Sequence, residues 1–289
     1  MPESTGPLCF SLMRIISLCP SLTELVFDLG LGGSLVGRTK FCVHPAPQVD
    51  AIEKVGGTKN PKIARIVELA PDIVLMNEEE NRLEDAEALR SAGINCHTSM
   101  PRTITETAAM VRSIGSALGT AGPAEVIARD IETRGAEVAG RAQEPVRYVY
   151  LIWREPWMTI NNDTFVHALL ANAGGVNVFG KLPDRYPTIT LLQIRDATPD
   201  IVLLSTEPFP FAERHIEELA GKTGIPRERV VVVDGELLSW HGSRTPRGIV
   251  YAGEVMDSGD AAGRGVVREH RRADARSAPL QRASSRRLP

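Results

Sequence analysis

Cys42 and His44 are the pair of residues in this sequence best suited to direct metal chemistry. A thiolate and an imidazole bind soft and borderline metal ions, and either could replace an axial ligand of cobalt or iron. In an extended segment, residues i and i+2 point to the same side, so both side chains could reach one ion. The C-x-H spacing alone is also compatible with a small buried cysteine beside a hydrogen-bonded histidine, and both interpretations stay open.

A second candidate chemistry is the stacking of aromatic rings on a large planar ligand. Aromatic residues make up only 5% of the 289 residues, yet several follow predicted strands. Each such ring can bury roughly 150–250 Å². The alternative is that the rings pack within the protein core. The candidates are Phe41, Trp153, Trp157, Tyr186, Phe209 and Trp240.

Polar groups near these rings could orient such a ligand. Pro20 and Ser21 form a turn before a predicted helix, and a helix N-terminus suits a carbonyl or phosphate group. His241 and Arg244 lie in the segment SWHGSR. Arg244 could hold a carboxylate or phosphate of a ligand, or could make an ion pair within the protein. The acidic run at residues 78–80 would need a cation to offset its self-repulsion, and we interpret it as a solvated loop.

These residues are positioned by two copies of one pattern of strands and helices. The first copy begins with an apolar strand at residues 14–18 and the second with a strand at 147–153. APDIVLMN in the first copy matches TPDIVLLS in the second. Continuous apolar strands alternating with helices are typical of parallel sheets covered on both faces. The pattern predicts an α/β fold with two Rossmann-like lobes. Within the first copy, Ser21 and Glu24 have the spacing of a capping box.

A long helix is predicted between the two copies. A helical pattern over residues 104–118 is broken at 119–123. A second pattern then runs for about 20 residues, which is roughly 30 Å of helix and enough to join two lobes stiffly. Ligands of two-lobed α/β proteins bind where strand ends face each other across a cleft. We predict five parts: an N-terminal extension at residues 1–12, an N-terminal lobe at 13–120, a linking helix at 121–144, a C-terminal lobe at 145–256 and a disordered basic tail at 257–289.

Composition excludes several classes of protein. A net charge of −3 with 43% hydrophobic residues fits a globular chain and excludes collagen-like, disulfide-scaffold and wholly disordered proteins. Residues 257–289 hold eight arginines against four acidic residues, so the rest of the chain is acidic. An acidic body gives no support to nucleic-acid binding. The four cysteines lack C-x-x-C spacing, and we expect free thiols.

Targeting signals are not evident in the sequence. No run reaches the roughly 18 apolar residues of a membrane span. The apolar residues before Met13 lack the basic region and small-residue cleavage site of a signal peptide. The sequence as written therefore predicts a cytoplasmic location.

Several motifs of the chain resemble one known family. RIISLCPSLTELVFDLGLGGSLVGRTKFCVHP, KVGGTKNPKIARIVELAPDIVL, DIVLLS and LLSWHGSR follow one another along residues 13–256. This order resembles the helical-backbone metal receptors, which are the type III solute-binding proteins of ABC importers, and most of all their cobalamin-binding branch. The resemblance implies a type III periplasmic binding protein fold with a single long backbone helix. It also implies non-covalent binding of cobalamin or a related metal chelate between the lobes, with no catalysis and no required cofactor.

The resemblance implies a partner and a compartment as well. Members of the family are usually periplasmic or lipid-anchored outside the cell, and those that dock on an ABC permease present a glutamate on each lobe. Ala64 and Leu192 occupy the aligned positions here. We therefore expect docking to be lost or to use other residues, and we expect a monomer.

Two other functions stay open at this point. One is a receptor for an iron chelate, haem or a bare metal ion, with Cys42 and His44 as ligands. The other is a tetrapyrrole-processing enzyme of chelatase-like architecture. The enzyme has less support, because the sequence contains no G-x-S-x-G motif, no G-x-x-x-x-G-K-[ST] motif and no evident nucleophile with its base.

Overall fold

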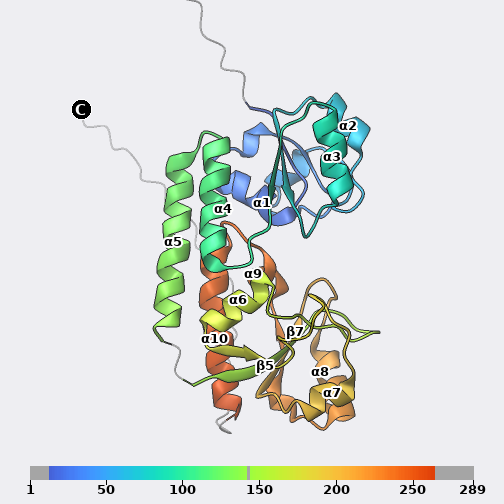
Figure 1. Cartoon of the computed structure of the whole chain (residues 1–289), viewed down its shortest axis with the longest axis vertical. Helices are drawn as coiled ribbons and strands as arrows, with labels where there is room; N and C mark the ends of the chain where they lie inside the picture. The colour runs from blue at the N-terminus through green and yellow to red at the C-terminus, as the bar shows by residue number, and fades with distance from the viewer. Residues whose placement is uncertain (1–12, 142–143, 264–289) are drawn as a thin grey trace, which may run out of the picture.

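Two four-stranded parallel sheets form the centres of two lobes (Figure 1). The computed structural model describes residues 13–141 and 144–263. The sheet orders are β2-β1-β3-β4 and β6-β5-β7-β8, so the second lobe repeats the topology of the first. The predicted two-lobed parallel α/β fold is confirmed. The strands are β1 Ile15–Ser17, β2 Leu35–Arg38, β3 Ile73–Asn77, β4 Cys96–Ser99, β5 Val146–Leu151, β6 Gly175–Asn177, β7 Ile201–Ser205 and β8 Val230–Val233.

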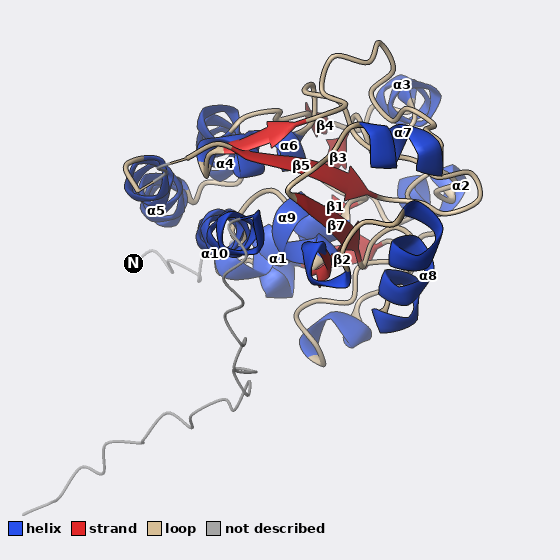
Figure 2. Cartoon of the chain, turned by 90° about the horizontal axis from the view of Figure 1, so that it is seen from below, coloured by secondary structure: helices blue, strands red, loops and turns tan. Residues whose placement is uncertain are grey.

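Helices lie on both sides of the strands in each lobe (Figure 2). The central strands β3 and β7 are buried at every position, as their continuous apolar sequences require. The helices of the N-terminal lobe are α1 Pro20–Asp28, α2 Ile63–Glu68 and α3 Leu83–Ser91. Those of the C-terminal lobe are α6 Phe165–Asn172, α7 Leu191–Asp196, α8 Glu213–Thr223, α9 Gly235–Ser239 and α10 Thr245–Gly263.

The same set of hydrogen bonds is found at the start of the first strand in each lobe. The backbone N–H of Arg14 donates to Asp72 Oδ2 at 2.7 Å, and that of Arg147 donates to Asp200 Oδ2 at 2.8 Å. The side chain of Arg14 also donates to the carbonyl oxygen of Leu69 at the C-terminal end of α2. That of Arg147 donates to the carbonyl oxygen of Ala197 at the C-terminal end of α7. Both aspartates lie in the repeated sequence P-D-I-V-L, which continues into β3 in the first lobe and β7 in the second. The repeat therefore stabilises the equivalent strand pairs, β1 with β3 and β5 with β7.

A column of helices joins the lobes (Figure 1). α4 Ile104–Ala117 and α5 Ala121–Ala139 form an antiparallel pair, and α5 also packs against α10. A Cβ atom at Gly115 would lie 2.1 Å from that of Ala124, so glycine permits the close approach of α4 and α5. One apolar cluster extends from Ile15 in the first sheet through Ile131 on α5 to Tyr148 in the second sheet. The lobes therefore share a core along the column.

The predicted boundaries at the ends of the chain are only partly covered by the structure. α10 continues to Gly263, so residues 257–263 are helical where the sequence suggested a disordered tail. Residues 1–12, with Cys9, and the remainder of the predicted tail lie outside the described residues. Across 13–141 and 144–263, no helix combines the length and the apolar character needed to cross a membrane.

Candidate ligand-binding cleft

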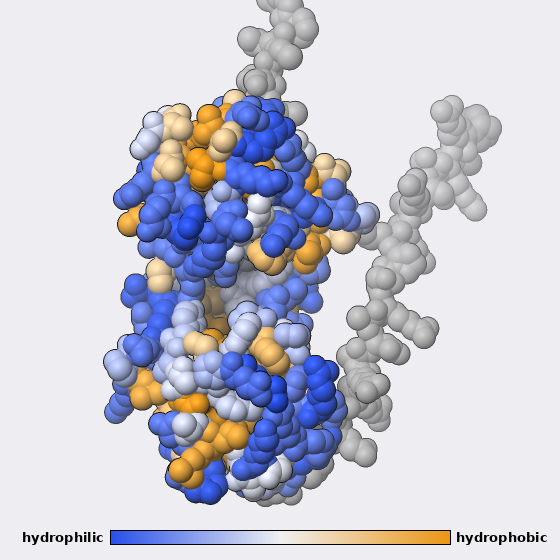
Figure 3. All heavy atoms as spheres, turned by 90° about the vertical axis from the view of Figure 1, so that its right-hand side faces the viewer, coloured by the Kyte–Doolittle hydropathy of each residue, from blue (hydrophilic) through white to orange (hydrophobic). Residues whose placement is uncertain are grey.

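A cleft of about 790 Å³ lies between the two lobes. Figure 3 shows the surface hollowed at this level. The lining residues follow the carboxyl ends of strands in both sheets: Ser21 after β1, Glu79 after β3, Trp153 after β5 and Glu207 after β7. This is where parallel α/β sheets bind ligands, and the volume lies within the usual range for such sites.

Three aromatic side chains stay exposed inside the cleft. Phe41 of the N-terminal lobe is 50% exposed, and Trp153 and Tyr186 of the C-terminal lobe are 40% and 37% exposed. Trp240 also lines the cleft but is nearly buried. Large apolar rings gathered in a hollow and left open to solvent mark a place that a ligand covers.

Trp157 and Phe209 do not line this cleft, although both were among the aromatic residues predicted to stack on a ligand. Trp157 stacks on Phe211 with ring centroids 6.1 Å apart, and Phe209 lies 4.7 Å from the same ring. Both pack against the smaller apolar cluster of the C-terminal lobe. Phe209 also meets the edge of Trp153 at 5.7 Å, so it supports a cleft residue from behind.

Cys42 and His44 do not form a metal pair. The Cys42 thiol is fully buried between Thr23 and Thr39, whose hydroxyl oxygens lie 3.0 and 3.1 Å from its sulfur. Burial raises the pKa of this thiol, which keeps it protonated. His44 instead lies 3.3 Å from Glu236. Within the described residues, no group of three or more histidines, cysteines and acidic residues is placed to hold a metal ion.

His241 connects the two lobes at the floor of the cleft. Its Nδ1 lies 2.8 Å from Ser21 Oγ and its Nε2 lies 2.7 Å from Asn77 Nδ2. The Asn77 amide is oriented by the backbone N–H groups of Glu79 and Glu80, which donate to its Oδ1. Asn77 Nδ2 is therefore the donor to His241, so Nε2 is the unprotonated nitrogen and Nδ1 donates to Ser21.

The predicted capping box at the first helix is wrong. α1 begins at Pro20, with Cys19 at the N-cap position and no side-chain cap. Ser21 bonds to His241, and Glu24 pairs with Arg244, so both residues of the motif make contacts with the other lobe. Pro20 and Ser21 do line the cleft.

Acidic pH is expected to destabilise the fold through His241. Burial lowers the pKa of His241 from 6.5 to about 4, so the unfolded chain binds a proton that the folded chain excludes. Stability is then lost as pH falls from the unfolded value toward the folded one, by about 2 kcal/mol at pH 5 relative to pH 7.5. Urea unfolding at the two pH values measures this loss in the wild type and in His241→Gln.

The variant should lose about 2 kcal/mol less than the wild type between the two pH values. Other histidines with lowered pKa contribute equally to both proteins, so their effect cancels. An identical pH dependence in the two proteins would show that His241 carries no such shift.

Arg244 does not line the cleft but joins the lobes beside it. Its Nε and Nη2 donate to the two carboxylate oxygens of Glu24, each at 2.8 Å, and its Nη1 pairs with Glu236. The guanidinium also lies 4.3 Å from the centroid of Trp240. Glu24 belongs to α1 of the N-terminal lobe, so this arginine makes an ion pair across the lobes and is not free to hold a ligand anion.

A second set of ion pairs joins the lobes elsewhere. Arg185 Nε lies 3.0 Å from Glu79 Oε1 and its Nη1 lies 3.3 Å from Asp163 Oδ2. Arg102, which precedes α4, lies 3.1 Å from the other oxygen of Asp163. Together with Arg244 and His241, these contacts hold the lobes at several points around the cleft.

The charged residues that line the cleft were not among the ligand-binding residues predicted from the sequence. The charged side chains are Lys40, Lys59, Glu79, Glu80 and Glu207. Glu79 and Glu80 belong to the cleft wall, so the acidic run is not only a solvated loop. The repeat contains a signal for this, because aligning DIVLMNEE with DIVLLSTE places Glu79 opposite Glu207.

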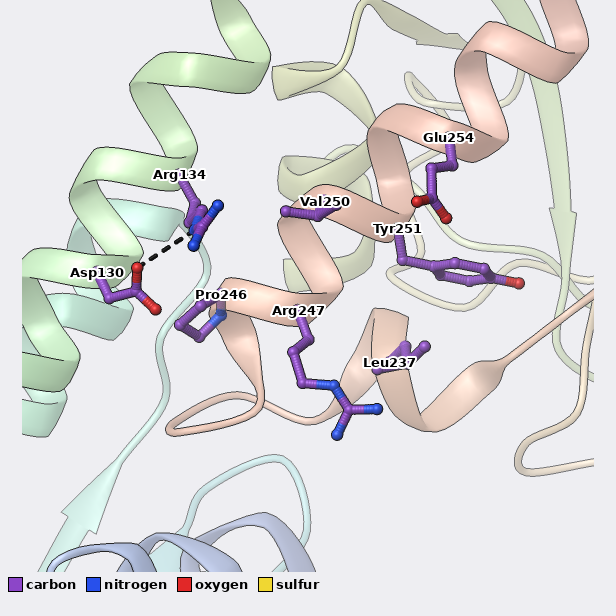
Figure 4. Close-up of a pocket in the computed structure, with 8 residues that line it drawn as sticks. All are labelled: Asp130, Arg134, Leu237, Pro246, Arg247, Val250, Tyr251 and Glu254. Carbon is purple, nitrogen blue, oxygen red and sulfur yellow. Dashed lines mark hydrogen bonds and ion pairs between the residues drawn. The ribbon is translucent and has the colours of Figure 1, made fainter. Parts of the chain in front are cut away.

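A smaller hollow of about 370 Å³ lies on the helical column (Figure 4). α5 contributes Asp130 and Arg134, which pair at 3.3 Å, and α10 forms much of the remainder. Tyr251 lines it, but its hydroxyl already accepts the backbone N–H of Asp234 at 3.0 Å. None of the predicted site residues lines this hollow, and the interlobe cleft is the better candidate site.

The aligned docking positions lie on the surface of α2 and α7. Ala64 is exposed, and Leu192 is 54% exposed. A partner that contacts these positions meets aliphatic groups and no carboxylate.

Comparisons with known proteins agree with this architecture. Residues 15–226 match the periplasmic binding protein family. The vitamin B12-binding protein of Vibrio cholerae serotype O1 is 26% identical over 198 residues, which cover 68% of this chain and 71% of that protein. The corresponding protein of Photorhabdus laumondii is 26% identical over 195 residues, which cover 67% and 70%.

Solved structures share the fold. The crystal structure of the periplasmic vitamin B12-binding protein of Vibrio cholerae matches with a TM-score of 0.74 at 22% identity, covering 86% of this chain and 97% of that one. The periplasmic haem-binding protein of Roseiflexus sp. RS-1 matches with a TM-score of 0.73 at 22% identity, covering 88% and 100%. The family match spans most of the chain and both lobes have the expected topology, so this chain belongs to the periplasmic binding protein family.

Proposed function

We propose that this chain is a solute-binding protein that holds cobalamin or a related metal chelate in the interlobe cleft, without catalysis. The observation that carries the proposal is the exposure of Phe41, Trp153 and Tyr186 inside the cleft, from both lobes. A flat chelate between these rings would cover apolar surface on two sides. The vitamin B12-binding relatives and the haem-binding structural neighbour support a ligand of this kind.

An intact chelate fits the cleft better than a bare metal ion. A chelate brings its own metal ligands, whereas the described residues offer no cluster that would supply them. Cys19 lines the cleft, but burial raises the pKa of its thiol to about 12, so it is no thiolate at neutral pH. The ligand is therefore cargo and not a resident cofactor.

The proposed setting is an ABC import route, as the resemblance of the sequence motifs to solute-binding proteins of ABC importers implies, with the chain acting as a monomer. Ala64 and Leu192 would then leave permease docking to residues other than glutamates at those positions.

Titration with cyanocobalamin tests the proposal. Trp153 and Trp240 line the cleft, so a coloured chelate bound there should quench tryptophan fluorescence saturably. We expect a Kd of about 1 μM or lower, which corresponds to a binding free energy of roughly −8 kcal/mol or more favourable. Free N-acetyltryptophanamide corrects for light absorbed by the ligand. Haemin and a ferric siderophore are titrated in parallel. Absence of saturable quenching by cyanocobalamin rejects the cobalamin assignment, and absence with all three ligands rejects chelate binding.

A further inference from the structure

Two carboxylates of the cleft have no cationic partner. Glu80 and Glu207 form no ion pair with any residue in the described parts of the chain, whereas Glu79 is paired with Arg185. The polar contact of the Glu207 carboxylate is the indole N–H of Trp240, which donates to its Oε2 at 3.0 Å. Glu80 follows β3 and Glu207 follows β7, so the two groups enter the cleft from opposite lobes.

Burial and neighbouring carboxylates disfavour the charged form of both glutamates. Burial raises the pKa of both glutamates. Nearby carboxylates raise it further, Glu79 in the case of Glu80, and Glu236, Asp234 and then Glu80 in the case of Glu207. Glu80 is exposed within the cleft, and Glu207 is half-buried. A third negative charge brought into the cleft would be repelled by both carboxylates, and more strongly where the ligand itself displaces water from between the charges.

The cations near the cleft offset these charges only in part, because the charge of Lys59 lowers the pKa of Glu80 but burial raises it more. Lys40 and Lys59 line it but are exposed. Lys59 Nζ donates to the backbone carbonyl of Glu79 at 2.6 Å, and Lys40 Nζ lies 4.9 Å from the Phe41 ring centroid. Arg185 and Arg244 are held by carboxylates of the protein.

We propose that Glu80 and Glu207 select metal chelates whose periphery carries amides or positive charge, and reject chelates that carry free carboxylates. This selectivity rests on the proposed chelate-binding function. A primary amide has two N–H donors, and a hydrogen bond to a carboxylate is stronger than one between neutral groups. A carboxylate at the same place has no proton to donate at neutral pH and sets like charges against each other.

Two corrinoids that differ in these groups test the selectivity. Dicyanocobinamide has an amide periphery, and dicyanocobyrinic acid carries carboxylates instead. At pH 7.5, the full chain is expected to bind the amide form at least tenfold more tightly, measured by calorimetry. The double variant Glu80→Gln/Glu207→Gln keeps the shape of both side chains, and should bind the acid at least fivefold more tightly than the wild type does. Its affinity for the amide form should fall, because an amide N–H makes a weaker hydrogen bond to a neutral glutamine oxygen than to a carboxylate, so the preference for the amide form narrows from both sides.

A matched control variant tests whether the change in affinity requires the loss of a negative charge inside the cleft. Glu84→Gln, on the exposed side of α3 and outside the cleft, should change neither affinity. Equal binding of both corrinoids by the wild type would overturn the inference, as would an unchanged affinity of the double variant for the acid.

Binding of two haem compounds shows whether a negative result counts against the charge selectivity or against the proposed function. Haemin and its dimethyl ester differ in the charge of the two propionates. If no corrinoid binds but the ester binds at least fivefold more tightly than haemin, the cobalamin assignment fails and the charge selectivity stands. If none of the four chelates binds, both fail.

Discussion

Replacing Trp153 with alanine is expected to weaken cyanocobalamin binding by roughly five- to thirtyfold, or about 1–2 kcal/mol. The indole lines the cleft and is 40% exposed in the free chain, so a ligand that covers it removes apolar surface from water. The ring meets the edge of Phe209, and its loss should leave the fold intact. Calorimetric titration of the variant at pH 7.5 gives the change in affinity.

Leu192→Ala is the matched control for this experiment. Leu192 is another exposed apolar residue, but it lies on α7 and does not line the cleft. Its removal should leave the affinity unchanged. If Trp153→Ala binds within twofold of the wild type, the exposed ring does not contact the ligand and the aromatic wall is misplaced.

Replacing Arg244 with methionine is expected to cost about 3–5 kcal/mol of folding free energy. The arginine side chain is only 9% exposed and pairs with Glu24 of the N-terminal lobe and Glu236 of its own lobe. Methionine keeps much of the side-chain volume, so the loss comes mainly from two carboxylates left close together without their cation. Urea unfolding at pH 7.5 measures the change.

Two further variants identify the cause of that loss. Arg244→Lys retains the charge but not the two-pronged contact with Glu24, and should recover only part of the stability. In a double-mutant cycle with Glu24→Gln, the coupling energy isolates the contact between the lobes. A loss below about 1 kcal/mol in Arg244→Met would place this pair among weak surface ion pairs.

The fold was predictable because its information is periodic and repeated. The matching segments at residues 70–77 and 198–205 each contain a buried strand. Asp72 in the first and Asp200 in the second each accept a backbone N–H at the start of the first strand of their lobe. Apolar strands and amphipathic helices have a fixed period, so their type and their buried faces can be read from sequence.

The site was only partly predictable because it is built from loops. Trp153 and Trp157 lie four residues apart in one connection, yet the first faces the cleft and the second packs in the core. Phe41 lines the cleft and its neighbour Cys42 is fully buried. No period links residue number to direction in such segments, so residue type identified the candidates and tertiary packing decided among them.

The several attachments between the lobes have a consequence for how a loaded chain is recognised. The shared core, His241 at the cleft floor and the ion pairs of Arg244 and Arg185 fix the position of one lobe against the other. Binding then costs little conformational entropy, and the angle between the lobes carries little information about occupancy. A partner that distinguishes loaded from empty chains must therefore read the ligand itself, or the rim side chains that it covers, such as Phe41 and Tyr186.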